Sequence, residues 1–330
     1  MSSVVRKLFR MSPAEGFLRA ALAATPLHDA LNTWLRRQVS NPDSRTKLNS
    51  RYLKLNYLER ALFHALFSRA FRDVPNSLQD GEWLVEFRGK QLRMPLRSSS
   101  MWLDWDSASA ITGHDIDVKA AYEALLEGNP PPRVFFDIGT NYGTHSLLML
   151  SQGMQVVSFE PNPACHEFFK QMCELNDVAP VIEGAAVGDV PGKAEFWFPA
   201  HDTWLGSMVN STKEQLEGEF DLEKIDVRVT TVDEFVAKTG IEPDVIKIDT
   251  EGNEEKVLRG AAETIRKKKP VILFEANVLS DRTPLWEVIR ENPYEIAELT
   301  VGDSSFDPKW LTIDEFISSR GGNFIAFPRG

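Results

Sequence analysis

Cysteine is scarce in this 330-residue chain, and so are long apolar runs and net positive charge. The two cysteines, Cys165 and Cys173, lie in one segment with helical periodicity, at a spacing that fits neither a zinc site nor a disulfide framework. No stretch approaches the roughly 18 apolar residues that are needed to cross a bilayer. These absences argue against a disulfide-stapled domain and a transmembrane protein, and they predict a cytoplasmic chain.

Acidic residues outnumber basic ones, 48 against 37, which gives a formal net charge of -11. This charge argues against a general nucleic-acid binder, since binding to phosphates needs a basic surface. The first 60 residues nevertheless contain 11 Lys and Arg against 4 Asp and Glu. We interpret this basic stretch as a solvated helical face, and peripheral contact with a membrane or an acidic partner stays an alternative.

Two regions of different character follow each other along the chain. Residues 1–128 show mainly helical periodicity, plus a β-like patch, EWLVEFRGKQLRMPL, whose alternation breaks at RGK as in a hairpin. The segment GNPPPR then ends this region, because three consecutive prolines cannot continue a helix. We therefore expect a helical N-terminal region over 1–128 and a second domain over 129–330.

Apolar strands alternate with amphipathic helices in the second region. A two-strand excursion is expected around KAEFWF and DVRVTTV. The other strands are expected over residues 134–138, 155–160, 179–187, 244–249 and 270–276. This alternation predicts a parallel sheet covered by helices on both faces, which is a doubly wound α/β domain.

The first of these strands runs into a turn that contains two glycines. In the stretch VFFDIGTNYGTHSL, Asp137 is followed by Gly139 and Gly143, with Thr140 and Asn141 between them. In a doubly wound sheet, ligands bind beyond the carboxyl ends of the strands. Small residues let the backbone approach a ligand closely, and the N-terminus of the next helix offers N–H groups. The turn predicts a site for a nucleotide-like cofactor, and a plain tight turn is the alternative.

An acidic residue, Glu160, ends the second strand, 23 residues after Asp137. A carboxylate there can accept hydrogen bonds from both hydroxyls of a ribose, which NAD and S-adenosylmethionine both contain. The glycine spacing is G-x-x-x-G, whereas dinucleotide folds use G-x-G-x-x-G. Asp137 would repel a pyrophosphate but attract a sulfonium and an α-amino group. The residues therefore favour S-adenosylmethionine, and an NAD-dependent oxidoreductase on a Rossmann-like sheet is the alternative.

Three stretches give the chain a strong resemblance to the FkbM-type methyltransferases, which use S-adenosylmethionine. They are FFDIGTNYGTHSL, VVSFEPNP and DVIKIDTEGNEEKVLRGA. The resemblance implies a seven-stranded, Rossmann-like methyltransferase sheet and methyl transfer to an oxygen of a sugar, a polyketide or another small metabolite. It also implies cofactor contacts: Asp137, Gly139, Asn141 and Gly143 at the methionine moiety, Glu160 at the ribose, Asn162 near the ribose or adenine, and Ala186 beside the adenine.

The motif IKIDTEGNE places Asp249 at the end of a buried apolar strand and Glu251 two residues later. Both carboxylates are expected to face the cofactor, and Lys247 is expected to pair with a carboxylate. An alcohol must lose its proton to a base or be acidified by a metal ion. We predict that Asp249 and Glu251 act in catalysis. The alternative is that Asp249 caps the next helix and Glu251 forms a salt bridge.

Two further groups are candidates for a part in the reaction. Glu275 ends the following strand, and with Asp249 and Glu251 it would offer hard oxygen ligands to Mg²⁺. No ligand spacing marks a metal site, so no residue is assigned as a metal ligand and Mg²⁺ stays an alternative. His201 lies in a long loop that could close over a substrate, and it is a candidate general base.

These observations predict an S-adenosylmethionine-dependent O-methyltransferase that acts on a small-molecule or carbohydrate-like acceptor. Residues 1–128 are expected to form a lid on the acceptor side or a homodimer contact. The NAD-dependent oxidoreductase is weakened by the missing G-x-G-x-x-G. A second alternative is a scaffold without enzymatic activity that binds a partner or a membrane through its N-terminal helices.

Overall fold

The computed structural model of the chain divides into two compact units, Met1–Lys119 and Ala120–Gly330. The division falls within α7 (Ile116–Leu126), whereas the sequence pattern places the boundary after residue 128. The part that the expected N-terminal region plays stays a prediction. The structure describes residues 26–71, 78–97, 105–199, 206–209, 214, 217, 220–278, 280–300 and 308–329.

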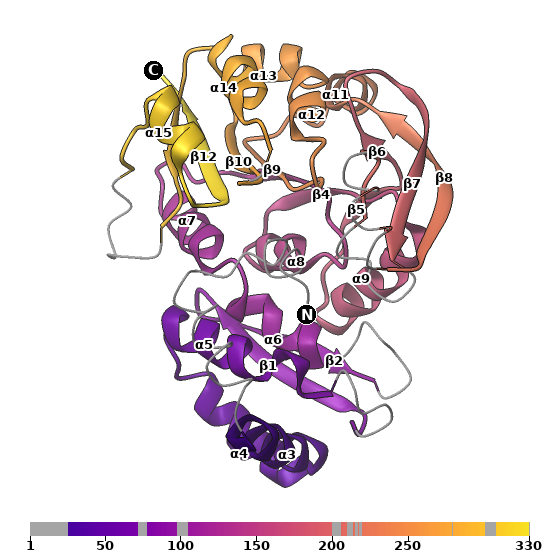
Figure 1. Cartoon of the computed structure of the whole chain (residues 1–330), viewed down its shortest axis with the longest axis vertical. Helices are drawn as coiled ribbons and strands as arrows, with labels where there is room; N and C mark the ends of the chain where they lie inside the picture. The colour runs from indigo at the N-terminus through magenta and orange to yellow at the C-terminus, as the bar shows by residue number, and fades with distance from the viewer. Residues whose placement is uncertain are drawn as a thin grey trace. The chain divides into compact units, whose positions relative to one another are not determined.

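The first unit contains helices and a β-hairpin (Figure 1). Aromatic side chains pack between these elements. Arg88 and Gly89, with φ values of 47° and 72°, form the two-residue turn that the break at RGK predicts. Trp83 and Trp105 are fully buried, and their rings meet edge to face at 4.9 Å. The elements are α3 (Pro26–Ser40), α4 (Pro42–Tyr52), α5 (Tyr57–Phe67), the 3-10 helix η1 (Ser68–Phe71), β1 (Gly81–Phe87), β2 (Lys90–Leu96) and α6 (Trp105–Gly113).

The second unit contains a seven-stranded sheet in the order β11-β12-β10-β9-β3-β4-β5. Its strands are β3 (Val134–Ile138), β4 (Gln155–Phe159), β5 (Val181–Glu183), β9 (Val245–Ile248), β10 (Val271–Glu275), β11 (Tyr294–Glu298) and β12 (Asn323–Pro328). β12 pairs antiparallel with both of its neighbours, β11 and β10, and the other neighbouring strands of this sheet pair parallel. The strand order reverses between β3 and β9, so the predicted doubly wound fold is confirmed and its switch point lies beyond these two strands.

Helices cover both faces of this sheet (Figure 1). On one face Phe136, Ile138 and Ile246 pack against α11 to α15, and on the other face α7 and α8 cover β3 and β4. Because side chains alternate along a strand, Asp137 points away from the larger apolar core and toward α8. The helices are α8 (Thr144–Ser151), α9 (Pro163–Leu175), α11 (Val232–Thr239), α12 (Glu254–Arg259), α13 (Ala262–Lys268), α14 (Thr283–Arg290) and α15 (Ile313–Ser318).

The single strand expected over 179–187 is wrong, because two strands of different sheets occupy this segment. β5 belongs to the large sheet, whereas β6 (Ala186–Val187) pairs with β8 (Leu222–Thr230) in a sheet that β7 (Gly192–Pro199) completes. The chain turns between them, where the N–H of Ala185 donates to the carbonyl of Glu183 at 2.8 Å. A run of apolar residues indicates that a segment is buried but not where the chain changes direction. Hydrophobic periodicity alone therefore does not reveal such a turn.

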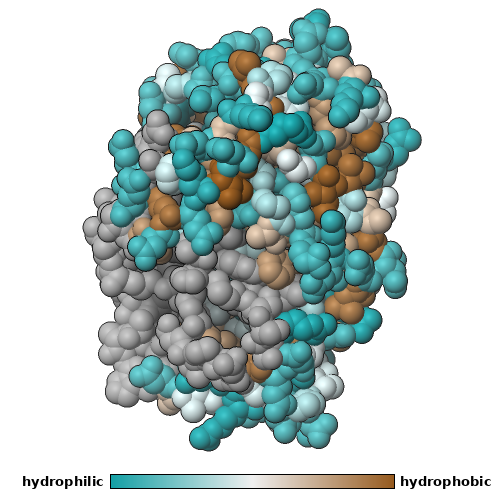
Figure 2. Space-filling model, turned by 90° about the vertical axis from the view of Figure 1, so that its right-hand side faces the viewer, coloured by the Kyte–Doolittle hydropathy of each residue, from teal (hydrophilic) through white to brown (hydrophobic). Residues whose placement is uncertain are grey.

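The surface is mainly hydrophilic on the face that Figure 2 shows, with apolar residues scattered across its described part. Among the described side chains of the N-terminal helices, Trp34 on α3 and the pair Leu58 and Leu62, one turn apart on α5, are large, apolar and exposed. A few exposed apolar residues are ordinary on protein surfaces. Within the described ranges, no helix combines the length and apolar character that a membrane crossing requires. The cytoplasmic location stays a prediction.

A buried arginine joins the segments that follow β10 and α15. Arg282 is only 2% exposed, and its guanidinium lies 5.0 Å from the centre of the Phe324 ring. It donates hydrogen bonds at 2.6–3.0 Å to the backbone carbonyls of Ala276, Phe316, Ser319 and Gly321. One side chain therefore supplies donors to four backbone carbonyls, two of which belong to fully buried residues, Ala276 and Phe316.

We expect R282M to lower the free energy of unfolding by about 3 kcal/mol or more, because buried carbonyls lose their donor. R259M is the matched control, since Arg259 is an exposed arginine that pairs with Glu255 and Glu291. The loss in this variant should be much smaller, because exposed ion pairs contribute little to stability. Urea unfolding of both variants measures the difference. If both variants lose the same free energy of unfolding, the hydrogen bonds of Arg282 contribute no more to stability than an exposed ion pair.

Candidate functional site

The carboxylate of Asp137 lies at the carboxyl end of β3 and is completely buried. Its in-register neighbours are Ser158 on β4 and Lys247 on β9, so all three side chains lie on the α8 face. Ser146 of α8 donates to Asp137 Oδ2 at 2.6 Å and lies 2.8 Å from the Ser158 hydroxyl. Burial raises the pKa of Asp137, and the charge of Lys247 opposes this shift. Asp137 Oδ1 has no hydrogen-bond donor among the described residues.

Lys247 lies between two carboxylates. Its Nζ is 3.2 Å from Asp249 Oδ2 and 4.0 Å from Asp137 Oδ1. The Lys247 side chain is 7% exposed and that of Asp249 is 29% exposed, so Asp249 is the more open end of this row. The prediction that Lys247 pairs with a carboxylate is confirmed, and the second partner, Asp137, is a feature that sequence reasoning missed. A buried ammonium needs such partners to compensate for its lost hydration.

Both glycines of the turn are explained by packing within the protein. Gly139 has φ +82°, and a Cβ there would lie 1.7 Å from the carbonyl oxygen of Asp249. Gly143 has φ +79°, and a Cβ there would lie 2.0 Å from the ring of Phe169. The close approach at Gly139 joins the turn after β3 to the loop after β9. Contacts of Gly139 and Gly143 with a cofactor stay predictions.

Glu160 holds the turn in place from the end of β4. The N–H of Asn141, a residue with φ 51°, donates to Glu160 Oε2 at 2.7 Å, and the N–H of Asn162 donates to Oε1 at 2.8 Å. Thr140 closes the turn, since its hydroxyl donates to the carbonyl of Asp137 at 2.7 Å. Burial raises the pKa of Glu160 to about 7. Each carboxylate oxygen keeps a second acceptor position, which a ribose hydroxyl would use.

Asn162 is the N-cap of α9, where its Oδ1 accepts the N–H of Ala164 at 3.1 Å. Its Nδ2 is buried, and no described residue accepts from it. An unsatisfied buried amide is destabilising, so this group fits a ligand that offers an acceptor. Ala186 is buried in β6, opposite Val229 of β8. The placement of an adenine beside Ala186 stays a prediction.

Three carboxylates converge beyond β9 and β10. One oxygen from each of Asp249, Glu251 and Glu275 lies within 4.8 Å of the other two, and all three residues are half-buried. Strand ends that are neighbours in a parallel sheet bring these side chains together, as the sequence predicts. Like charges at this distance repel each other, so the cluster fits hydroxyl donors or a hard cation such as Mg²⁺. The catalytic roles of Asp249 and Glu251 stay predictions.

Glu254 fixes the loop that carries two of these carboxylates, and sequence reasoning missed it. Its buried Oε1 accepts hydrogen bonds at 3.0–3.1 Å from the N–H groups of Thr250 and Gly252 and from the Thr250 hydroxyl. The signal in the sequence is an acid in the first turn of a helix that follows a small polar loop. The N-cap of α12 is Asn253, so the alternative that Asp249 caps this helix is wrong.

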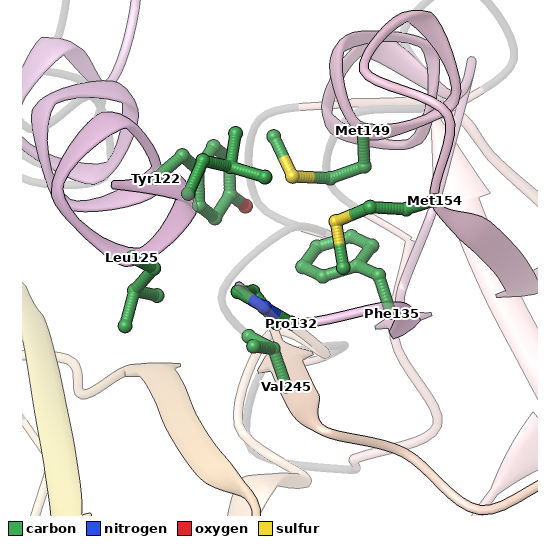
Figure 3. A pocket seen from close by; sticks show the side chains of 8 residues that line it. Tyr122, Leu125, Pro132, Phe135, Met149, Met154 and Val245 are labelled. Atoms are coloured by element: carbon green, nitrogen blue, oxygen red, sulfur yellow. The ribbon is translucent and has the colours of Figure 1, made fainter. Parts of the chain in front are cut away.

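His201 lies outside the described residues, so its role as a base stays a prediction. His145 is buried on α8, and its Nδ1 lies 3.0 Å from the hydroxyl of Tyr122. Figure 3 shows a small pocket beside Tyr122, where Met149 and Phe135 contribute apolar surface. It lies toward the amino end of β3, away from the carboxylates. We interpret this pocket as imperfect core packing, because its lining is apolar apart from Tyr122.

Comparison with known proteins gives a family and a distant relative. The model of the methyltransferase FkbM domain matches residues 137–321. The hexuronic acid methyltransferase AglP of Haloferax volcanii is 30% identical over 152 residues, which are 45% of this chain and 58% of that protein. The chain therefore matches less than two thirds of the length of this relative.

Solved structures of methyltransferases are similar only at a low level. A methyltransferase FkbM from Methylobacillus flagellatus KT is 16% identical with a TM-score of 0.38, over 68% of this chain and 54% of that chain. An O-methyltransferase from Bacillus cereus, in complex with SAH, is 16% identical with a TM-score of 0.35, over 64% and 80% of the two chains.

Gly139 and Gly153 share φ +82°, but only Gly139 has a neighbour in the path of a Cβ. We expect G153A to lower the free energy of unfolding by about 1 kcal/mol, because alanine resists positive φ. G139A should lower it by at least about 2 kcal/mol more, since the loop with Asp249 must move. Urea unfolding measures both. If the two variants lose the same stability, the close approach is not a constraint.

Because Glu160 is buried, its titration should make the free energy of unfolding depend on pH. The pKa of Glu160 is about 7 in the folded protein, against 4.5 for an exposed glutamate. The folded state therefore holds this proton more tightly, and stability falls as pH rises from about 4.5 to about 7. The stability of wild type relative to E160Q should fall by up to about 1.4 kcal/mol per pH unit in this window. Urea unfolding at several pH values tests this, and a constant difference would contradict the shifted pKa.

Proposed function

The chain belongs to the FkbM family of methyltransferases, and from this premise we propose that it transfers a methyl group from S-adenosylmethionine to a hydroxyl oxygen of a small, sugar-like acceptor. The observation that supports this proposal most directly is the row formed by Asp137, Lys247 and Asp249 at the switch point of the sheet. Ligands of doubly wound sheets bind at this place.

The polar groups around the glycine turn suit S-adenosylmethionine. Two carboxylates and one ammonium give the row a net negative charge, which favours a cationic cofactor over the pyrophosphate of NAD. Asp137 Oδ1 and Asn162 Nδ2 have no hydrogen-bond partner in the part of the chain that the structure describes, and Glu160 retains acceptor positions for a ribose. When bound, the cofactor supplies a methyl group on a sulfonium. The residues named here bind and orient it.

The carboxylates of Asp249, Glu251 and Glu275 suit the acceptor. Half-buried carboxylates accept hydrogen bonds from hydroxyl groups and can take a proton from one of them. Holding a hydroxyl in line with the methyl group also contributes to the rate, by up to roughly 7–11 kcal/mol in well-oriented reactions. The activity named for AglP supports a sugar-like acceptor. An acidic sugar would approach the three carboxylates through its hydroxyl groups, because its own carboxylate is repelled.

Mg²⁺ is an alternative occupant of the same three carboxylates, whose oxygen atoms are the ligands that it prefers. Lys247 already compensates for the charge of Asp249, which weakens the attraction for a second cation. We therefore propose that the three carboxylates act on the acceptor without a metal ion. Binding and turnover with EDTA and with added Mg²⁺ distinguish the two cases. For residues 1–128 we propose an acceptor-side lid or a homodimer contact, and the mass of the protein in solution tests the dimer.

Calorimetric titration tests the cofactor. We expect saturable binding of S-adenosylmethionine and S-adenosylhomocysteine and no binding of NAD. D137A and E160A should each weaken the affinity for S-adenosylmethionine by at least about tenfold, because charge-assisted contacts contribute about 1.5–3 kcal/mol each. E223A removes an exposed acid of β8 and should leave the affinity unchanged.

The other outcomes select between the alternatives. Binding of NAD alone would favour the oxidoreductase, and binding of neither cofactor would favour the scaffold. If both D137A and E160A keep the wild-type affinity, the proposed cofactor site is wrong. If E223A weakens binding as much as they do, the effect reflects net charge and not this site.

A further inference from the structure

Lys247 forms more than a simple ion pair, because its ammonium lies close to two carboxylates with different surroundings. Asp137 is rigid, since it lies within β3 and accepts a hydrogen bond from Ser146. Asp249 follows the end of β9, and its side chain is the more exposed of the two. Lys247 Nζ lies closer to Asp249, at 3.2 Å, than to Asp137, at 4.0 Å.

The surroundings of this ammonium leave it little freedom. Lys247 projects from the central strand β9, whose four residues are all buried. Its in-register neighbour on β3 is Asp137, and its in-register neighbour on β10 is the apolar Leu273. The carboxylates of Asp137 and Asp249 both lie near Nζ as charge partners. A change at one carboxylate therefore alters how strongly the ammonium compensates for the other.

We propose that Lys247 is a positioning residue that holds the Asp249 carboxylate in place. Lys247 also couples the charge of Asp249, on the acceptor side, to the strength with which Asp137 attracts the cofactor. This inference rests on the proposed function, in which Asp137 attracts the cationic cofactor. Loss of the charge at Asp249 removes one charge partner of the ammonium, so the ammonium compensates more fully for the charge of Asp137. Asp137 then attracts the cofactor less strongly.

A purely structural role predicts something different. If Lys247 only compensates for the buried Asp137, its removal lowers stability and has no bearing on what happens at Asp249. A direct contact between Asp249 and the cofactor also predicts something different. In that case D249N weakens cofactor binding by the same factor whether or not Lys247 is present.

A double-mutant cycle separates these cases, with S-adenosylmethionine as the calorimetric probe. The four proteins are wild type, D249N, K247M and K247M/D249N. We expect D249N to raise the Kd for S-adenosylmethionine about fivefold or more when Lys247 is present, and less than about twofold in the K247M background. K247R keeps a cation, so D249N should have its large effect in that background. Equal effects of D249N in the wild-type and K247M backgrounds overturn the proposal.

Unfolding in urea provides a second readout that needs no ligand. Cycles of K247M with D249N and of K247M with D137N should each be non-additive by about fivefold or more in the unfolding equilibrium constant. Additivity in either cycle overturns the shared role. K247Q replaces K247M in every cycle if K247M does not fold. If wild type binds no S-adenosylmethionine, the proposed function fails, while the unfolding cycles still decide whether Lys247 couples to both carboxylates.

Discussion

The carboxylate of Asp137 is buried at the centre of a seven-stranded sheet, and the arrangement around it follows from the need to compensate for that charge. An isolated buried carboxylate is strongly destabilising in an apolar core. Ser146 donates to one of its oxygens, and Lys247 brings a positive charge from the neighbouring strand. The same ammonium then places Asp249. One buried charge therefore organises groups from β3, α8, β9 and the loop that follows β9.

Two turns meet where these strands end, and each depends on the other. Gly139 gives room to the carbonyl of Asp249, while Glu254 holds the backbone of the loop that Asp249 begins. On the other side, Glu160 ties the glycine turn to the start of α9. The site therefore rests on backbone geometry that several buried carboxylates maintain. Such support keeps the side chains that face ligands in fixed positions.

The roles that we propose for the acidic residues follow from their burial. Asp137, Glu160 and Glu254 are buried and bonded to the protein, which suits them to shape the site, and Asp137 and Glu160 are the ones proposed to bind the cofactor. Asp249, Glu251 and Glu275 are half-buried and close together, which suits them to meet an acceptor. A methyltransferase needs both functions, because the methyl donor and the acceptor must be aligned before the reaction.

The sequence by itself determined the doubly wound sheet, the hairpin at Arg88 and Gly89, and the convergence of Asp249 and Glu275, because periodicity and strand ends are local signals. It did not show that residues 179–187 divide between two sheets, because a buried apolar pattern does not indicate where the chain turns. Only the tertiary structure decided why Gly139 is glycine and which partners Lys247 takes. These depend on strand order, which brings segments more than 100 residues apart into register.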